Sequence, residues 1–132
     1  MTTLGYAGKI LRIDLSSGST SEVSTLDYVS FLGGRGLAAK IYWDEVPPEI
    51  NAFDVDNRLI FAIGPLAGLP VLGSSRWTIC GKSPVPVPEQ FCYGNLGGSW
   101  GAELKLPAMM PSWSKANRKS QSTSSFMTAS LN

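Results

Sequence analysis

Glycine and acidic residues are confined to one part of this chain. All fourteen glycines and all ten aspartate and glutamate residues of the 132-residue sequence lie before Pro107. Residues 107–132 are instead rich in serine, methionine and basic side chains, with little apolar periodicity. Because glycine marks turns and apolar periodicity marks helices and strands, only the first part has the pattern of a folded unit. We therefore predict one folded domain over residues 1–106 and a non-native, disordered tail over residues 107–132.

Charge and hydropathy exclude several classes of partner. The formal net charge is +1, so no strong field draws nucleic acid or an anionic membrane surface. The longest apolar run, residues 59–72, is interrupted by Pro65 and Pro70 and is too short to cross a bilayer. The N-terminus lacks the basic start and long apolar centre of a signal peptide. We expect a cytoplasmic protein with no nucleic-acid partner and no membrane partner.

The chain contains few of the side chains that commonly act in catalysis or metal binding. The chain has no histidine, which removes the commonest general base and excludes a hydrolase built on a Ser-His or Cys-His pair. Its two cysteines, Cys80 and Cys92, do not have the close spacing of zinc or iron–sulfur motifs. Both are interpreted as core or strand thiols, and no catalytic residue is predicted in this chain.

Residues 1–106 alternate between strand and helix patterns. Alternating or continuous apolar segments predict strands, and segments with helical spacing that follow capping residues predict helices. The first two strands form a hairpin, and Thr25 or Asp27 caps the first helix. This mixture predicts an α+β fold with a mostly antiparallel sheet and short helices. The expected strands are residues 9–15, 21–24, 58–63 and 76–80, and the expected helices are residues 25–32, 37–46 and 97–106.

Glycine-rich loops precede helices or a strand at three places. They are residues 33–36, residues 64–73 leading to Arg76, and residues 94–98. Glycine lets a backbone approach a ligand closely, helix starts attract anions, and arginine can bind two phosphate oxygens at once. None of these loops matches a P-loop or a dinucleotide fingerprint. The spacing alone therefore leaves two readings open: an anion site, or ordinary turns beside a surface arginine.

Five segments carry a resemblance to a known family. They are GYAGKILRIDLSSG, FLGGRGLAAKIYWDEVPP, NRLIFAIGPLAG, GSSRWTICGKSP and NLGGSWGAELK, in this order over residues 5–106. In this succession they resemble the N-terminal domain of the aldehyde:ferredoxin oxidoreductases. The resemblance implies an incomplete domain of that fold. It also implies a parent enzyme that oxidises aldehydes to carboxylic acids and passes electrons to ferredoxin. That enzyme carries tungsten (or molybdenum) on two pyranopterins, a magnesium ion and a 4Fe–4S cluster.

The resemblance implies roles for four residues. Arg76 matches the arginine between the pterin and the cluster, and Asn95 matches the residue whose side-chain oxygen holds the magnesium ion between the pterin phosphates. Gly97 and Gly98 match glycines that let the backbone lie against the cofactor. Taken without the family, Asn95 would be read as a loop residue or a helix cap. The family's cluster cysteines and acid–base residues come later in a longer chain, so we expect this chain alone to be inactive.

The tail departs from the family at Leu106. Family members continue with AGYDAIVVEG, a buried strand. In the shifted reading frame, each new codon consists of the third base of one codon and the first two bases of the next. Because methionine has a single codon, Met109-Met110 then reads as Asp and Met110-Pro111 reads as Ala. A suitable choice of synonymous codons lets the other positions match the family segment. We infer a one-base deletion at or just after Leu106. The sheet then loses a strand and has an unpaired edge, which predicts a marginally stable or aggregation-prone product.

Three alternatives to an aldehyde oxidoreductase fragment stay open on the sequence. The parent enzyme belongs to the same family but acts on an aromatic acyl-CoA instead of an aldehyde. The chain is a cofactor-binding module without catalysis. The chain is a non-functional gene fragment.

Overall fold

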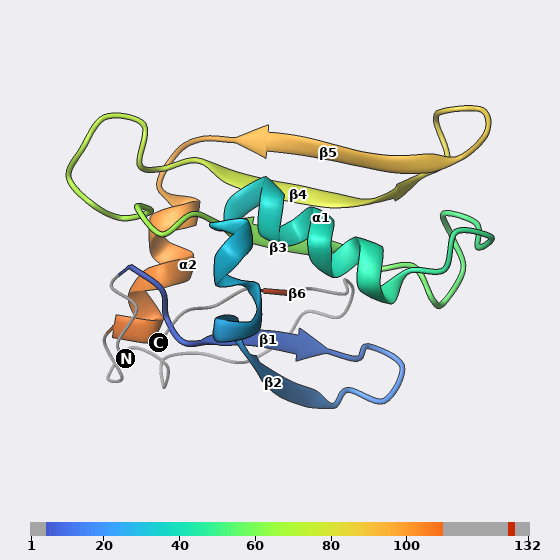
Figure 1. Ribbon diagram of the computed structural model, residues 1–132, viewed down its shortest axis with the longest axis horizontal. Helices are drawn as coiled ribbons and strands as arrows, with labels where there is room; N and C mark the ends of the chain where they lie inside the picture. The colour runs from blue at the N-terminus through green and yellow to red at the C-terminus, as the bar shows by residue number, and fades with distance from the viewer. Residues whose placement is uncertain (1–4, 110–126, 129–132) are drawn as a thin grey trace.

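The computed structural model describes residues 5–109 and 127–128, which build one six-stranded sheet with helices on both faces (Figure 1). The strand order is β2-β1-β6-β3-β4-β5, and all neighbours are antiparallel except β3 and β6. The α+β prediction with a mostly antiparallel sheet is confirmed. The strands are β1 (Lys9–Ile13), β2 (Thr20–Ser24), β3 (Ile60–Ile63), β4 (Trp77–Ser83), β5 (Gln90–Leu96) and β6 (Met127–Thr128), and the helices are η1 (Thr25–Phe31), α1 (Gly34–Glu45) and α2 (Trp100–Met109).

The first hairpin follows the predicted alternation. Strands β1 and β2 pair along their whole length, from Lys9–Ser24 to Ile13–Thr20. Asp14 closes the turn by accepting hydrogen bonds from the Ser17 hydroxyl and the Ser16 backbone N–H, and these bonds lower the pKa of its carboxyl. The predicted caps of the next helix were wrong, because the Ser24 hydroxyl accepts from the Leu26 N–H instead.

Helix α1 begins three residues earlier than predicted, at Gly34 rather than at residue 37. The glycine motif therefore provides the N-cap, Gly33, and part of the first turn of the helix. Gly33 and Gly34 adopt positive φ angles of 138° and 52°, and a Cβ on Gly36 would lie 2.5 Å from the Phe31 carbonyl oxygen. These glycines allow a sharp reversal from η1 into α1 and a close approach of the two helices.

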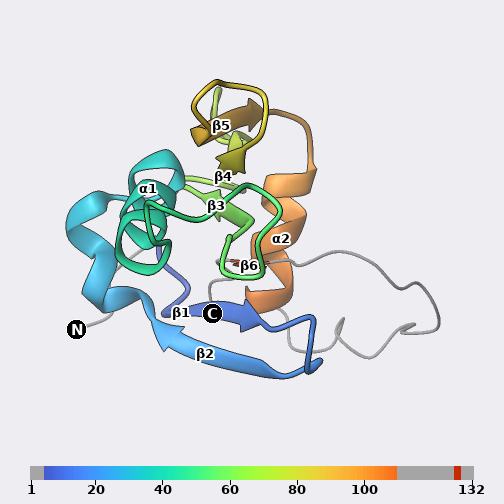
Figure 2. The same ribbon diagram turned by 90° about the vertical axis from the view of Figure 1, so that its right-hand side faces the viewer.

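The core lies on both faces of the sheet, as Figure 2 shows with α1 and α2 on opposite sides. Strand β3 alternates between the faces. Ile60 and Ala62 are 1% and 0% exposed and pack toward α1, in a cluster with Ile41. On the other face Ile63 packs with Leu104 of α2, and the Phe61 ring lies against aromatic side chains of β4 and α2. All four residues of β3 are buried, so this strand is covered on both faces.

Cys80 is a core thiol, as predicted. It lies on β4, is 2% exposed, and burial raises the pKa of its thiol to about 12. Cys92 lies half-buried on β5. No helix in the described part of the chain is long and apolar enough to cross a membrane.

Strand β5 and helix α2 also differ from the sequence prediction. Strand β5 was not predicted, although it pairs with β4 over seven residues, from Gln90 to Leu96. Helix α2 begins at Trp100 rather than at residue 97 and continues to Met109, beyond the predicted boundary at residue 106.

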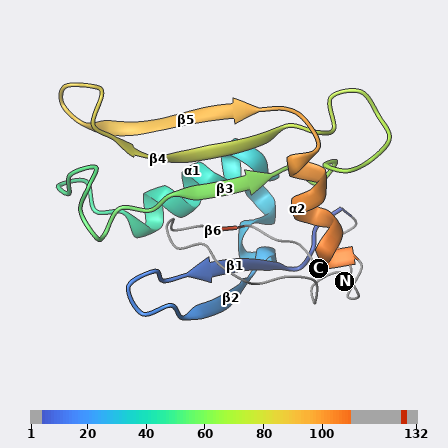
Figure 3. The ribbon, with the colours of Figure 1, turned by 180° about the vertical axis from the view of Figure 1, so that it is seen from behind.

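The predicted unpaired edge was misplaced. The structure places β6 inside the sheet, between β1 and β3, so the strand position after α2 is central (Figure 3). Two residues of the predicted tail, Met127 and Thr128, fill it in part. The prediction of disorder for residues 110–126 and 129–132 lies outside the described residues.

Candidate functional site

A pocket of about 400 Å3 opens at the carboxyl end of β3. Four elements meet there: the first turn of α1, the loop after β3, the start of β4 and the end of β5. The sheet explains this convergence, because β4 runs antiparallel to both β3 and β5 and so begins where they end. The pocket contains Arg76 and Asn95, which the sequence analysis singled out, together with Arg35 and Thr78.

Arg35 is held in place by an aromatic side chain. Its guanidinium donates a hydrogen bond to the Tyr93 hydroxyl, with a distance of 2.7 Å between Nη1 and the oxygen. The guanidinium carbon also lies 4.8 Å from the centre of the Tyr93 ring. Such a stacked and hydrogen-bonded arginine loses little further freedom when it binds an anion.

Arg76 lies exposed at the edge of the same pocket. Within the described residues its guanidinium makes no hydrogen bond or ion pair, so its donors are available to a ligand. Arg35 and Arg76 are the ionisable side chains among the described residues that line the pocket. No carboxylate in that lining offsets them, so the pocket has a positive potential.

Asn95 is oriented by a buried hydroxyl. Thr78, which is 3% exposed, donates a hydrogen bond of 2.9 Å from its Oγ1 to Asn95 Oδ1. The two residues are partners across β4 and β5, so Asn95 is neither a loop residue nor a helix cap. A carbonyl oxygen has two lone pairs, and this bond leaves one of them for a cation or a donor.

Gly97 and Gly98 directly follow β5 and are exposed, but they are not among the residues that line the pocket. Gly98 has a φ of +86°, which favours glycine for backbone reasons alone. Gly97 does not have a φ in this range, and nothing lies within 4 Å of an added Cβ. The same holds for Gly64, which does line the pocket. At Gly64 and Gly97, packing within the described chain does not require glycine.

Lys105 fixes the loop that forms one wall. This residue is 8% exposed and donates a 2.6 Å hydrogen bond from Nζ to the Pro65 carbonyl oxygen. Burial lowers the pKa of its ammonium group. The bond ties α2 to the loop after β3, so the pocket wall is supported from the second layer of the fold.

These residues fit the phosphate end of a metal cofactor better than a metal cluster. Two unneutralised guanidiniums, an oriented carboxamide oxygen and open glycine backbone suit phosphate groups and a hard cation. Among the described residues, no group of three or more histidine, cysteine or acidic side chains gathers to hold a metal ion. The protonated Cys80 thiol is a poor cluster ligand as well.

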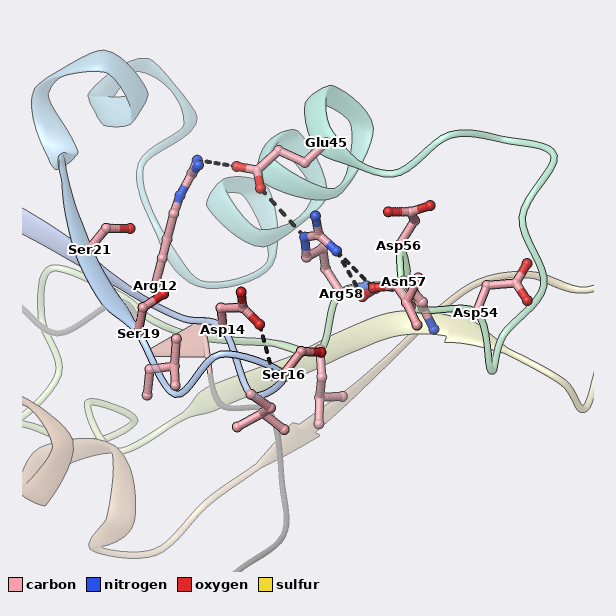
Figure 4. Close-up of a pocket in the computed structure, with 14 residues that line it drawn as sticks. Arg12, Asp14, Ser16, Ser19, Ser21, Glu45, Asp54, Asp56, Asn57 and Arg58 are labelled. Carbon is pink, nitrogen blue, oxygen red and sulfur yellow. Dashed lines mark hydrogen bonds and ion pairs between the residues drawn. The ribbon is translucent and has the colours of Figure 1, made fainter.

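A second pocket, of about 630 Å3, lies at the opposite end of the sheet (Figure 4). Here Glu45, at the end of α1, lies between two arginines. It forms an ion pair with Arg12 of β1 and lies 4.0 Å from Arg58 Nε. Asp54 and Asp56 also line this pocket. Its arginines are neutralised by acidic neighbours, so it lacks the unpaired positive charge of the first pocket.

Three residues of the site were not predicted from the sequence. Arg35 lies inside the glycine motif of residues 33–36, but that motif by itself gives its side chain no role. Thr78 and Tyr93 carried no signal in the sequence, because their roles depend on pairing across β4 and β5. Tyr93 also belongs to the strand that was not predicted.

Comparisons with known proteins agree with this geometry. The family model "Aldehyde ferredoxin oxidoreductase, N-terminal domain" matches residues 10–108. The chain is 39% identical over 104 residues to a tungsten-containing aldehyde ferredoxin oxidoreductase of Pyrococcus horikoshii, covering 77% of this chain and 17% of that protein. It is 33% identical over 84 residues to the WOR-like subunit of an aliphatic sulfonate oxidoreductase of Pyrococcus furiosus, covering 60% of this chain and 13% of that protein.

A solved structure is similar as well. The active-site complex BamBC of benzoyl coenzyme A reductase, in complex with 1,5-dienoyl-CoA, superposes with a TM-score of 0.70 at 39% identity. The match covers 76% of this chain and 16% of that one, so this chain spans only a small part of its relatives' length. The family match includes helix α1, most of α2 and every residue that lines the cationic pocket: the chain belongs to the aldehyde ferredoxin oxidoreductase family and matches its N-terminal domain.

Proposed function

We propose that this chain supplies part of the phosphate-binding floor of a tungstopterin site. The observation that carries the proposal is a pocket whose ionisable lining side chains are two unneutralised arginines, beside the Thr78-oriented Asn95 oxygen. Arg35 and Arg76 would bind phosphate oxygens, and Asn95 Oδ1 would be one ligand of a magnesium ion between the phosphates. Gly97 and Gly98 would let the backbone lie against the cofactor.

In the whole enzyme, we propose, the reaction is oxidation of an aldehyde to a carboxylic acid with ferredoxin as the electron acceptor, and a 4Fe–4S cluster would supply the electron-transfer chemistry. Tungsten (or molybdenum) on two pyranopterins supplies the two-electron chemistry when it is bound. The residues of this chain contribute binding and orientation, because the described lining of the pocket has two cationic side chains but no general base. The cluster ligands and the acid–base residues would come from polypeptide that this chain does not contain, so the chain alone would be inactive.

A second candidate for the parent reaction is chemistry on an aromatic acyl-CoA. The identity to the benzoyl coenzyme A reductase complex equals that to the aldehyde oxidoreductase, 39% in both cases. The pocket serves either candidate, because it would bind the cofactor and not the substrate.

The tail leads to a proposal about the gene, namely that a single-base deletion near Leu106 separates this chain from the rest of an enzyme. Nucleotide sequence downstream tests it: a shifted open reading frame encoding cluster cysteines is expected. An unshifted coding sequence that ends after Asn132 would exclude the deletion and favour a stand-alone binding module.

Titration calorimetry on the chain itself tests the pocket. Inorganic pyrophosphate with Mg2+, in low salt, serves as the probe for two bridged phosphates. We expect saturable binding, and we expect Arg76→Ala to weaken it about tenfold or more, because a charge-assisted hydrogen bond is worth about 1.5–3 kcal/mol. Lys40→Ala is the matched control, since Lys40 pairs with Asp44 on the exposed side of α1. Equal losses in both variants, or no binding at all, would reject the proposal.

A further inference from the structure

A tyrosine outside the cationic pocket bonds to the backbone that leads into it. Tyr6 lies in the segment before β1, and its hydroxyl donates a 2.6 Å hydrogen bond to the Leu32 carbonyl oxygen. It precedes residues 10–108, which the family model matches. Leu32 follows η1 and stands just before the start of α1, where Gly34 and Arg35 line the pocket. The Tyr6 hydroxyl therefore acts on the turn from which α1 begins.

This turn has a strained backbone at Leu32. The φ and ψ angles of Leu32 are +62° and −49°, and the Gly33 N–H donates a 2.7 Å hydrogen bond to the Phe31 carbonyl oxygen. Together these features form a γ-turn of the rare and strained kind. In the part of the chain that the structure describes, Leu32 is the one residue other than glycine with a positive φ. Such a residue keeps its conformation only where the surrounding structure holds it.

The segment that carries Tyr6 is anchored on the loop after β3. A Cβ on Gly5 would lie 2.9 Å from the Pro65 carbonyl oxygen, so the two backbones are in close contact. Ala7 is 5% exposed and belongs to the same core cluster as Ala67, which lines the pocket. Because both chain neighbours of Tyr6 are fixed on this loop, its hydroxyl connects one wall of the pocket to the start of the helix that forms another.

We propose that Tyr6 is a positioning residue for the cationic pocket. Its hydroxyl holds the strained turn at Leu32 and so fixes the start of α1, which brings Arg35 into one pocket with Arg76 and Asn95. Binding groups keep their geometry only when packing and hydrogen bonds behind them lock it. Without the hydroxyl the turn relaxes, and Arg35 no longer shares an anion with Arg76. This inference rests on the proposed phosphate-binding function.

Calorimetry with Mg2+ and pyrophosphate tests the role of the hydroxyl. In Tyr6→Phe we expect the affinity to fall about threefold or more, because the hydrogen bond that holds the turn is lost. Tyr28→Phe is the matched control. Tyr28 lies on η1 and packs against the core, but its hydroxyl makes no hydrogen bond to any described residue. An unchanged affinity in Tyr6→Phe, or an equal fall in Tyr28→Phe, would overturn the proposal.

Double variants separate positioning from a general loss of stability. Because Tyr6 acts through Arg35, Tyr6→Phe should weaken binding little further in Arg35→Ala but by its full factor in Arg76→Ala. Adding Leu32→Gly should restore most of the affinity that Tyr6→Phe loses, since glycine adopts positive φ angles readily. Equal factors in both arginine variants, or no recovery with glycine, would give Tyr6 a structural role only and overturn the proposal.

Nuclear magnetic resonance of the chain without ligand separates this inference from the proposed function. We expect Tyr6→Phe to shift the amide signals of Gly34 and Arg35, and Tyr28→Phe to leave them in place. Absence of pyrophosphate binding to the unmodified chain would reject the proposed function. Unchanged signals of Gly34 and Arg35 in ligand-free Tyr6→Phe would reject the positioning role of Tyr6, whether or not the chain binds pyrophosphate.

Discussion

At the scale of single residues, two of the side chains that would bind a ligand are oriented by neighbouring residues. The Arg35 guanidinium is held by Tyr93, and the Asn95 carboxamide is held by Thr78. Arg76 is different, because no described residue binds it. We infer that Arg35 and Asn95 are preorganised, whereas Arg76 becomes ordered only when a ligand binds.

The hydrogen bond from Thr78 gives a specific prediction. In Thr78→Val the Asn95 oxygen loses its donor, and we expect the Mg2+-dependent part of pyrophosphate affinity to fall several-fold. Binding without Mg2+ should change little, because the arginines remain. Calorimetry with and without Mg2+ measures both parts.

Thr25→Val is the matched control for this prediction. Thr25 is also buried, at 2% exposure, but its hydroxyl has no partner among the described residues and lies outside the pocket. We expect unchanged binding and equal or higher stability, since an unsatisfied buried hydroxyl is costly. An equal loss of Mg2+-dependent affinity in both valine variants would contradict the role assigned to Thr78.

At the scale of elements, the structure requires glycine at some positions and not at others. In α1, Gly36 permits contact with η1, because a Cβ there would lie 2.5 Å from a backbone oxygen. Gly97 has open space around it and an ordinary φ. The first glycine is explained by the fold, whereas packing within the described chain does not require the second.

This difference predicts that the same substitution, glycine to alanine, destabilises the fold at position 36 but not at position 97. Gly36→Ala should lower the free energy of unfolding by about 1–3 kcal/mol, because overpacking against a rigid backbone outweighs alanine's helix propensity of about 1 kcal/mol. Gly97→Ala should change it by less than about 0.5 kcal/mol. Urea denaturation of both variants measures the difference. Equal destabilisation would mean that Gly97 is also required by the fold.

The elements whose own sequence shows an apolar pattern were predicted from the sequence. The elements that are recognisable only from their pairing with other strands were not. The alternation of β1, the apolar run of β3 and the spacing of α1 follow from burial of one or both faces, which a sequence records directly. Strand β5 contains Gly94 and Asn95 and is largely exposed, so only its pairing with β4 defines it. The central position of β6 was missed for the same reason, since strand order is a non-local property.

At the scale of the whole molecule, the two ends of the sheet have different electrostatic character. The end with Arg35 and Arg76 has cations without described partners, whereas at the other end Glu45 lies between Arg12 and Arg58. The family pattern predicted Arg76 and Asn95, and the structure brings both into one pocket. Arg35 was not predicted as part of this pocket, because its position there depends on how the start of α1 lies relative to β4 and β5.

The stability of the whole domain should depend on alkaline pH through Cys80. Burial raises the pKa of its thiol from 9.0 to about 12, so the unfolded chain releases this proton first. The stabilisation is complete below pH 9 and is lost as the pH rises toward 12, by at most about 1.4 kcal/mol per unit. Lys105 acts in the opposite direction, because its pKa is lowered in the folded state and deprotonation there relieves the cost of burial.

Urea denaturation at several pH values between 8 and 11 measures this effect. We expect the free energy of unfolding to fall above pH 9 in the unmodified chain. In Cys80→Ala the fall should become much smaller, because only Tyr42, whose pKa burial also raises, and Lys105, which acts in the opposite direction, remain. A fall of the same slope in Cys80→Ala would show that another group is responsible.

The central claim is that the cationic pocket at the end of β3 is the phosphate site of this family member. Nuclear magnetic resonance of the 15N-labelled chain, titrated with Mg2+ and pyrophosphate, tests it most directly because each amide reports its own location. The account predicts saturable shifts of the amides of Gly34, Arg76 and Asn95, and loss of these shifts in Arg76→Ala. Shifts centred on Arg12 and Arg58 at the opposite end, or none anywhere, would contradict it.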